Sequence, residues 1–176
     1  GWAGLALLLA PAAAAAVGLG VFASLKPSSQ STAPGKGPIR LLTSGYIGTV
    51  ALALVLLLAT VIVAGVASST DDLGRPGRVL TLVSEHSAVT TGPFPGWFYG
   101  LPALAATAVL AGAGYAALHR LNSSPSLPGE ALIVANRRWR LGAARVVALV
   151  TLTVIFLEIA VMLFLALAAA RSGVAQ

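Results

Sequence analysis

Four long apolar segments constrain this chain more than any other feature of its sequence. They cover roughly residues 2–25, 42–68, 97–119 and 144–170, and each is long enough to cross about 30 Å of hydrocarbon at about 1.5 Å per helical residue. Only 9% of the 176 residues are charged, compared with about 25% in soluble domains. The sequence therefore predicts an all-α membrane protein, with four transmembrane helices forming one integral-membrane domain over residues 1–176.

The first segment is similar in position to a secretory signal peptide. No basic residue precedes it, however, and its apolar stretch exceeds the usual h-region of about 7–15 residues. We therefore expect a retained span. Proline is tolerated in transmembrane helices, so Pro11 predicts a kink rather than a break, with a re-entrant hairpin as the alternative.

The charges between the spans predict the topology. The three connecting regions, residues 26–41, 69–96 and 120–143, carry net charges of +3, −1 and +4, the last counting Arg145. By the positive-inside rule the first and third are cytoplasmic and the second is extracytoplasmic. Within the second, β-branched residues predict a small hairpin that pairs residues 79–83 with residues 88–91. Because the composition resembles that of membrane proteins from high-GC bacteria, we expect a multi-pass protein of the bacterial plasma membrane.

Glu158 is the strongest candidate for a functional site. It lies in the middle of the apolar run 146–170, with twelve residues of that run on either side and no other charge in it. A lone carboxylate at this depth costs roughly 2.5 kcal/mol or more when lipid surrounds it, so the side chain should face protein, a cavity or a partner. At helical spacing Thr151 is the polar residue on the same face.

Two interpretations of Glu158 are open. In one it is a protonatable site for a proton-coupled or cationic substrate, or a contact for a lipid or quinone. In the other it makes a structural interhelical hydrogen bond, or a salt bridge to another subunit. No basic residue lies at matching depth in the first three spans, which favours either a protonated side chain or a partner chain.

Two further patterns indicate packing and anchoring. Small residues four apart allow close helix approach, and they occur in the third and first spans: Ala108, Gly112 and Ala116, and Ala10, Ala14 and Gly18. Aromatic and basic residues near the span ends are typical of interface anchors. They are Trp97, Phe98 and Tyr99 before the third span, and Arg137, Arg138, Trp139 and Arg140 before the fourth.

Several chemistries are disfavoured. The chain has no cysteine, no phosphate-binding loop, no serine elbow and no paired carboxylates, so we expect no autonomous enzyme. His86 and His119 fall on opposite membrane faces, which argues against a shared haem or metal. An external cation site at Asp71, Asp72, Glu85 and His86 is a weaker alternative to a solvated loop. Of the eleven Lys and Arg, nine lie between the spans, Arg145 lies in the first turn of the fourth span and Arg171 follows it, which argues against nucleic acid as a partner.

These observations favour a non-catalytic subunit or accessory protein of a larger membrane complex of the respiratory or transport type. Its expected partners are the lipid bilayer and either other membrane subunits or further copies of itself. No cofactor is expected to bind this chain alone. The alternative is a small proton-coupled transporter that uses Glu158 as its protonatable group.

Overall fold

The computed structural model describes residues 2–24, 39–84, 87–123 and 130–174, which excludes the linker at 26–38. Its elements, in order, are α1 (Trp2–Ser24), α2 (Ile39–Ala67), β1 (Leu80–Ser84), β2 (Ser87–Thr91), α3 (Trp97–Ser123) and α4 (Glu130–Val174). Each helix contains most of one apolar segment of the sequence.

Three of the helices are long and apolar enough to cross a membrane. The qualifying stretches are Ser44–Ala67 in α2, Trp97–Ser123 in α3 and Val134–Val174 in α4. In α1 the apolar stretch among residues with described side chains, Leu9–Phe22, is shorter. The prediction of a helical membrane protein is therefore confirmed, whereas four complete spans stay a prediction.

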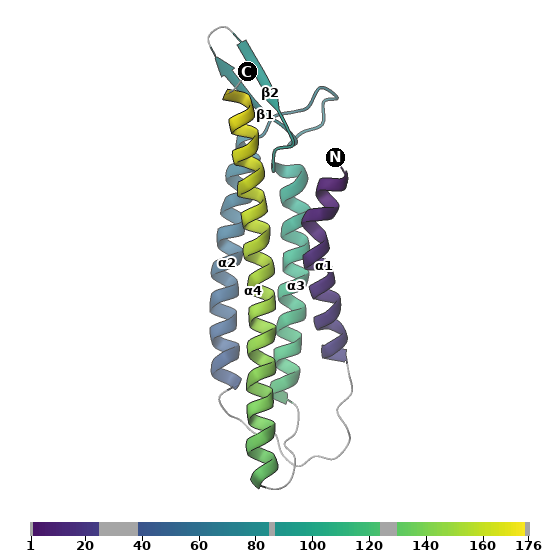
Figure 1. Cartoon of the computed structure of the whole chain (residues 1–176), viewed down its shortest axis with the longest axis vertical. Helices are drawn as coiled ribbons and strands as arrows, with labels where there is room; N and C mark the ends of the chain where they lie inside the picture. The colour runs from purple at the N-terminus through teal and green to yellow at the C-terminus, as the bar shows by residue number, and fades with distance from the viewer. Residues whose placement is uncertain (1, 25–38, 85–86, 124–129, 175–176) are drawn as a thin grey trace.

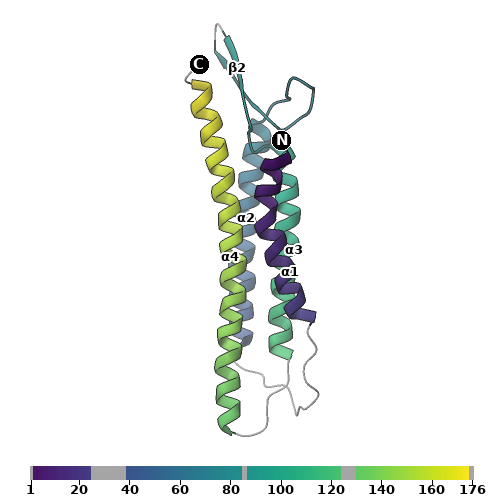
Figure 2. The same cartoon turned by 45° about the vertical axis from the view of Figure 1, so that its right-hand side comes forward.

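Helices α3 and α4 lie between α1 and α2 in Figure 1, and each of them contacts the three other helices. Figure 2 shows the same bundle turned, with α4 at its left side. Helix α1 packs on α3 and also touches α4, while α2 packs against both α3 and α4 from the other side. Apolar side chains from all four helices fill the interior between them. The largest that are fully buried are Leu57, Leu110, Leu118, Ile155 and Met162.

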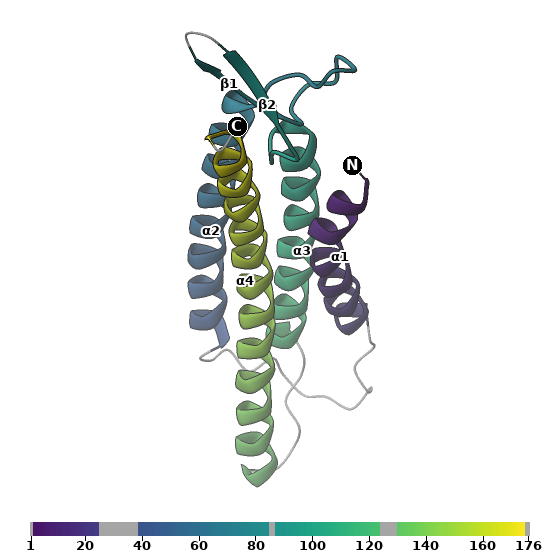
Figure 3. The same cartoon turned by 45° about the horizontal axis from the view of Figure 1, so that its top comes forward.

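The predicted hairpin is confirmed. Strands β1 and β2 pair antiparallel, with Leu82 opposite Val89, and the strand bounds differ from the prediction by about a residue. The hairpin lies at the same end of the bundle as both described chain ends, which we call the hairpin end (Figure 3). It is fastened to the end of α4, because Thr91 Oγ1 donates to the Ala169 carbonyl oxygen at 2.9 Å.

Helix α4 is longer than its predicted span. It begins at Glu130 rather than near residue 144 and runs without interruption to Val174. Its first turns project past the ends of α2 and α3, at what we call the basic end of the bundle (Figure 1). Much of the expected loop at 120–143 is therefore helical, because residues 130–141 contain neither proline nor glycine and are rich in Ala, Leu and Arg, all good helix formers.

Candidate functional site

The Glu158 side chain is enclosed within the bundle. It is 2% exposed, and its α4 neighbours Thr151, Ile155 and Met162 are also fully buried. The carboxyl group therefore faces protein within this chain, as the charge argument from the sequence requires.

Its contact is Thr107 of α3, which sequence reasoning missed. The Thr107 side chain is fully buried, and its Oγ1 is hydrogen-bonded to Glu158 Oε2. The same Oγ1 lies 2.8 Å from the carbonyl oxygen of Ala103, one turn earlier in α3. The contact joins the two central helices of the bundle.

Proton counting limits how this pair can be arranged. A threonine hydroxyl carries one proton, so Thr107 donates either to Glu158 or to the Ala103 carbonyl. When it donates to the carbonyl, a bond between Oγ1 and the carboxyl requires Glu158 to carry a proton of its own. A neutral Glu158 therefore allows Thr107 Oγ1 to bond to the Ala103 carbonyl and to Oε2 of the carboxyl at the same time, whereas an ionised one competes with Ala103 for a single proton.

No described cation lies near enough to neutralise Glu158. The basic residues nearest along α4, Arg145 and Arg171, are each thirteen residues away, which is about 20 Å of helix. Arg75 pairs with Asp71 at 2.8 Å, outside the spans. The second carboxyl oxygen, Glu158 Oε1, is buried and has no hydrogen-bond partner in the part of the chain that the structure describes. The neutral arrangement is the one consistent with these surroundings.

Thr151 belongs to a second polar layer, two helical turns from Glu158 towards the basic end. Its hydroxyl donates to the Val147 carbonyl at 2.9 Å and lies 3.5 Å from the Tyr46 hydroxyl, which donates to the Ala111 carbonyl at 3.1 Å. The structure therefore does not bring Thr151 to Glu158, although the two share a face of α4. Tyr46 was not among the site residues predicted from the sequence.

Gly114 makes the second layer possible. A Cβ atom there would stand 2.2 Å from the Tyr46 hydroxyl oxygen and 2.8 Å from Thr151 Oγ1, closer than real contacts allow. The absence of a side chain on α3 thus leaves the space that the tyrosine hydroxyl occupies. Glycine at this position was not among the small residues singled out from the sequence.

The two predicted small-residue stripes face outward. Ala10, Ala14 and Gly18 on α1 are exposed, as are Ala108, Gly112 and Ala116 on α3. The small residues that α3 turns towards its neighbours are instead Gly100, Ala103, Gly114 and Ala117. Both stripes are therefore free of packing within the described chain, and contact with a partner stays a prediction for them.

The aromatic residues at the start of α3 have three different surroundings. Trp97 is 37% exposed and packs over Gly65 of α2, where a Cβ would lie within 2.3 Å of the indole ring. Phe98 is half-buried, with the Arg78 guanidinium 3.6 Å from its ring centroid. Tyr99 is 4% exposed and lies inside the bundle. An interfacial role stays a prediction, and Trp97 is the member of the three with the exposure it requires.

The predicted anchors at the start of α4 also differ in their exposure. Arg137, Arg138 and Trp139 are exposed, as snorkelling anchors would be. Arg140 is only 7% exposed, and its guanidinium donates to the Asn136 side chain at 3.3 Å and to the Leu121 carbonyl, near the end of α3, at 3.4 Å. This arginine ties two helices together, so it contributes less to a charged surface than the sequence suggested.

No metal site is found in the described residues, where no group of three His, Cys, Asp or Glu side chains could hold an ion. Two members of the suggested external cation site, Glu85 and His86, lie outside those residues. A third, Asp71, accepts hydrogen bonds from the Leu73 and Arg75 amides and pairs with the Arg75 side chain.

No family model, curated protein or solved structure matches the chain. The helices alone define its class: with three of them long and apolar enough to cross a bilayer, this is a helical membrane protein.

Proposed function

We propose that this chain is a non-catalytic subunit or accessory protein of a larger integral-membrane assembly, of the respiratory or transport type. The observation that carries the proposal is the enclosure of Glu158. A carboxyl that is 2% exposed and bonded to Thr107 of the same chain suits a structural link between α3 and α4. A carrier would instead need its protonatable group to be reached by water and substrate.

The outer surface of the bundle supplies the contacts for such an assembly. In a membrane, helices associate mainly by close packing of small residues, since lipid is as apolar as the helix surface. Gly18 and Gly112 each lie in an outward stripe, and a Cβ atom added at either position would meet nothing within 4 Å. The chain itself therefore leaves both positions open, and a partner helix, from another subunit or a second copy, would pack there.

The proposal includes the membrane arrangement. All four helices cross the bilayer of a bacterial plasma membrane, with the basic end in the cytoplasm and the hairpin outside. Helix α1 has 23 residues, about 34 Å of helix, which is enough to span. Cysteines introduced singly into this cysteine-free chain, in the hairpin and at the basic end, would report the orientation by labelling from one side of sealed vesicles.

The experiment is affinity purification of the tagged chain from its native membrane, followed by measurement of the stoichiometry of co-purifying subunits. We expect a fixed ratio for the wild type and for Gly48→Leu, and loss of the partner for Gly112→Leu. Gly48 is a matched control because it is an exposed helical glycine with nothing within 4 Å, on α2 rather than on a stripe. A monodisperse, isolated chain in native nanodiscs would contradict the proposal.

One observation favours a second candidate, a small proton-coupled transporter. Glu158 Oε1 is buried and lacks a hydrogen-bond partner in the described residues, and an unpaired acceptor at mid-membrane depth could bind a cationic substrate after the proton leaves. The test is Glu158→Gln, which should abolish transport in proteoliposomes while leaving the helical content and assembly unchanged. Unaffected transport would exclude this candidate.

A further inference from the structure

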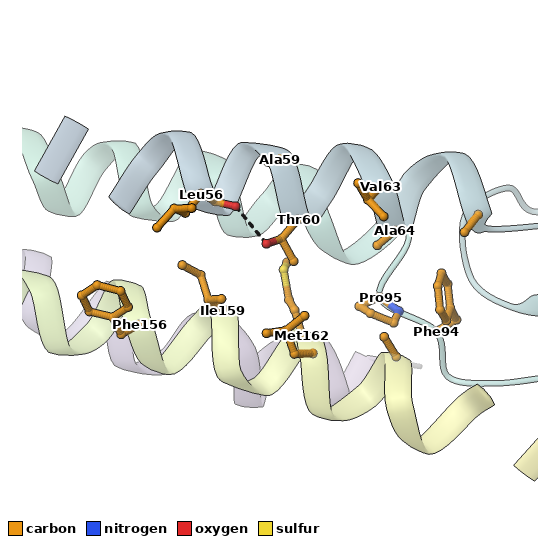
Figure 4. Close-up of a pocket in the computed structure, with 13 residues that line it drawn as sticks. Leu56, Ala59, Thr60, Val63, Ala64, Phe94, Pro95, Phe156, Ile159 and Met162 are labelled. Atoms are coloured by element: carbon orange, nitrogen blue, oxygen red, sulfur yellow. Dashed lines mark hydrogen bonds between the residues drawn. The ribbon is translucent and has the colours of Figure 1, made fainter. Parts of the chain in front are cut away.

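An apolar groove runs between α2 and α4 in the half of the bundle nearer the hairpin end (Figure 4). Its cavity volume is about 510 Å³. Its walls are one face of each helix, and it ends at Phe94 and Pro95, in the segment between the hairpin and α3. The groove lies apart from Glu158, which is not among its lining residues.

The groove has a buried floor and an exposed rim. Met162 and Ala64, on the floor, are 0% and 7% exposed, whereas Val63, Phe156 and Leu163, on the rim, are all more than half exposed. An apolar ligand could therefore enter sideways from the surrounding bilayer without any movement of the helices.

Nothing in the lining needs a polar ligand. The one hydroxyl there belongs to Thr60, and it donates to the Leu56 carbonyl at 2.8 Å, as Figure 4 shows. The remaining lining side chains are hydrocarbon, apart from the thioether of Met162. Water would find no unsatisfied partner in such a groove, and an empty groove would forfeit dispersion contacts along both walls.

The length of the groove matches one leaflet. From Phe156 to Ala166 it follows ten residues of α4, which is about 15 Å, half of the roughly 30 Å hydrocarbon thickness. It starts level with Glu158, the centre of the apolar run, and ends where α4 meets the hairpin. The groove thus covers the depth that an acyl chain occupies in the leaflet on the hairpin side.

From these observations we propose that the groove is a binding site for one acyl chain of a membrane phospholipid. A partner helix, about 10 Å across, would rest on the exposed rim and leave the buried floor unfilled, whereas a flexible hydrocarbon chain can follow the floor. A quinone is disfavoured because its ring carbonyls would find no free donor in the lining. A single flexible hydrocarbon chain fits both the volume and the chemistry.

The test is native mass spectrometry of the chain, released in mild detergent from vesicles of phosphatidylethanolamine and phosphatidylglycerol. We expect the wild type to retain one phospholipid and Ala59→Phe, which places a ring in the groove, to lose it. Ala51→Phe is the matched control, because Ala51 is an exposed alanine of α2 outside the groove and should leave retention unchanged. Ala166→Leu fills the groove from α4 and should also cause loss.

Helical content measured by circular dichroism must match the wild type in all three variants. If one groove variant fails to fold, the other provides the test from the opposite wall. Equal retention by the wild type and a folded groove variant would overturn the proposal, as would a wild type without bound phospholipid. A retained isoprenoid quinone, or a co-purifying polypeptide lost only on filling the groove, would identify a different occupant and also overturn it.

Discussion

The carboxyl groups of Asp71 and Glu158 are satisfied in opposite ways. Asp71, in the loop after α2, accepts hydrogen bonds from the Leu73 amide at 3.0 Å and the Arg75 amide at 2.9 Å, and its other oxygen lies 2.8 Å from Arg75 Nε. Glu158, between α3 and α4, has one hydroxyl as its partner and, within the described chain, one bare oxygen. The loop supplies a cation and backbone donors, whereas the helical interior supplies neither.

The reason is the backbone. In a loop, amide groups are free to turn towards a side chain, but in a transmembrane helix every interior amide is already paired with a carbonyl four residues earlier. A buried carboxyl in a helix bundle therefore depends on side-chain hydroxyls, which carry one proton each. Asp71 is suited to the ionised form and Glu158 to the protonated form, even though the two share the same chemistry.

The largest expected effect comes from removing the partner of Glu158. Thr107→Val keeps the shape of the side chain but leaves a buried carboxyl without a hydrogen bond, so it should lower the free energy of unfolding by about 1–3 kcal/mol. This exceeds the average of about 0.6 kcal/mol for interhelical hydrogen bonds in a membrane protein, because the group left behind is a carboxyl. Unfolding in sodium dodecyl sulfate, followed by circular dichroism, measures it.

The control for that prediction is Glu158→Met, which removes the carboxyl. In this background Thr107 keeps its bond to Ala103, so Thr107→Val should have an effect close to zero. An equal effect in both backgrounds would mean that the two side chains do not interact and that the contrast with Asp71 is wrong.

A smaller effect is expected in the second polar layer. Tyr46→Phe removes the hydroxyl that bonds to the Ala111 carbonyl, but that carbonyl keeps its place in the hydrogen-bond ladder of α3. We expect a loss of about 0.6 kcal/mol, the usual value for such bonds. Tyr115→Phe, at an exposed tyrosine of the same bundle, should change nothing. If Tyr46→Phe lowered the free energy of unfolding more than Thr107→Val, the prediction that the Glu158 contact contributes more to stability than the Tyr46 contact would be wrong.

A local effect is expected at the loop carboxyl. Asp71→Asn keeps a side-chain oxygen for the two amides but removes the charge that pairs with Arg75. Hydrogen exchange of the Leu73 and Arg75 amides should become faster, while unfolding of the bundle stays at the wild-type value. Asp72→Asn, at the exposed neighbour, serves as the control. Slower or unchanged exchange in Asp71→Asn would show that the ion pair does not order the loop.

The pH dependence separates the two carboxyls further. Loss of hydration raises the pKa of Asp71, but the hydrogen bonds from Arg75 and Leu73 and the charge of Arg75 outweigh it and hold the pKa below its ordinary value. The stabilisation is therefore complete above the ordinary aspartate value of about 3.9, and is lost as the pH falls below it and through the lower pKa of the folded loop. Amide exchange measured from pH 6 downward, corrected for intrinsic rates, should show the loop opening only in this acid range, and opening near neutral pH would contradict this.

Much of this fold could be predicted from the sequence. Apolar length identified the helices, and β-branched residues beside a turn identified the hairpin. The burial of Glu158 followed from its charge alone. Its partner, Thr107, was not predicted, because the hydroxyl of a threonine in a helix can bond to a carbonyl of the same helix and then needs no other partner. The depth of the two residues along their spans could have indicated the contact. Thr107 is thirteen residues from Arg120, and Glu158 is likewise thirteen residues from Arg145.

Other features depend on three-dimensional packing. Gly112 and Gly114 are two glycines of the same helix, and the sequence does not distinguish their roles. Gly114 leaves space for the Tyr46 hydroxyl, whereas Gly112 faces outward. Likewise the groove between α2 and α4 arises from the way two apolar faces meet, and each face taken alone resembles ordinary lipid-facing helix.

The unbroken course of α4 has a mechanical consequence. Its 45 residues form a rod about 67 Å long, more than twice the hydrocarbon thickness. One end carries exposed arginines, and near the other end the Ala169 carbonyl accepts a hydrogen bond from the Thr91 hydroxyl of the hairpin. Because the helix is unbroken between them, the exposed arginines and the hairpin contact belong to one element and are held a fixed distance apart along its axis.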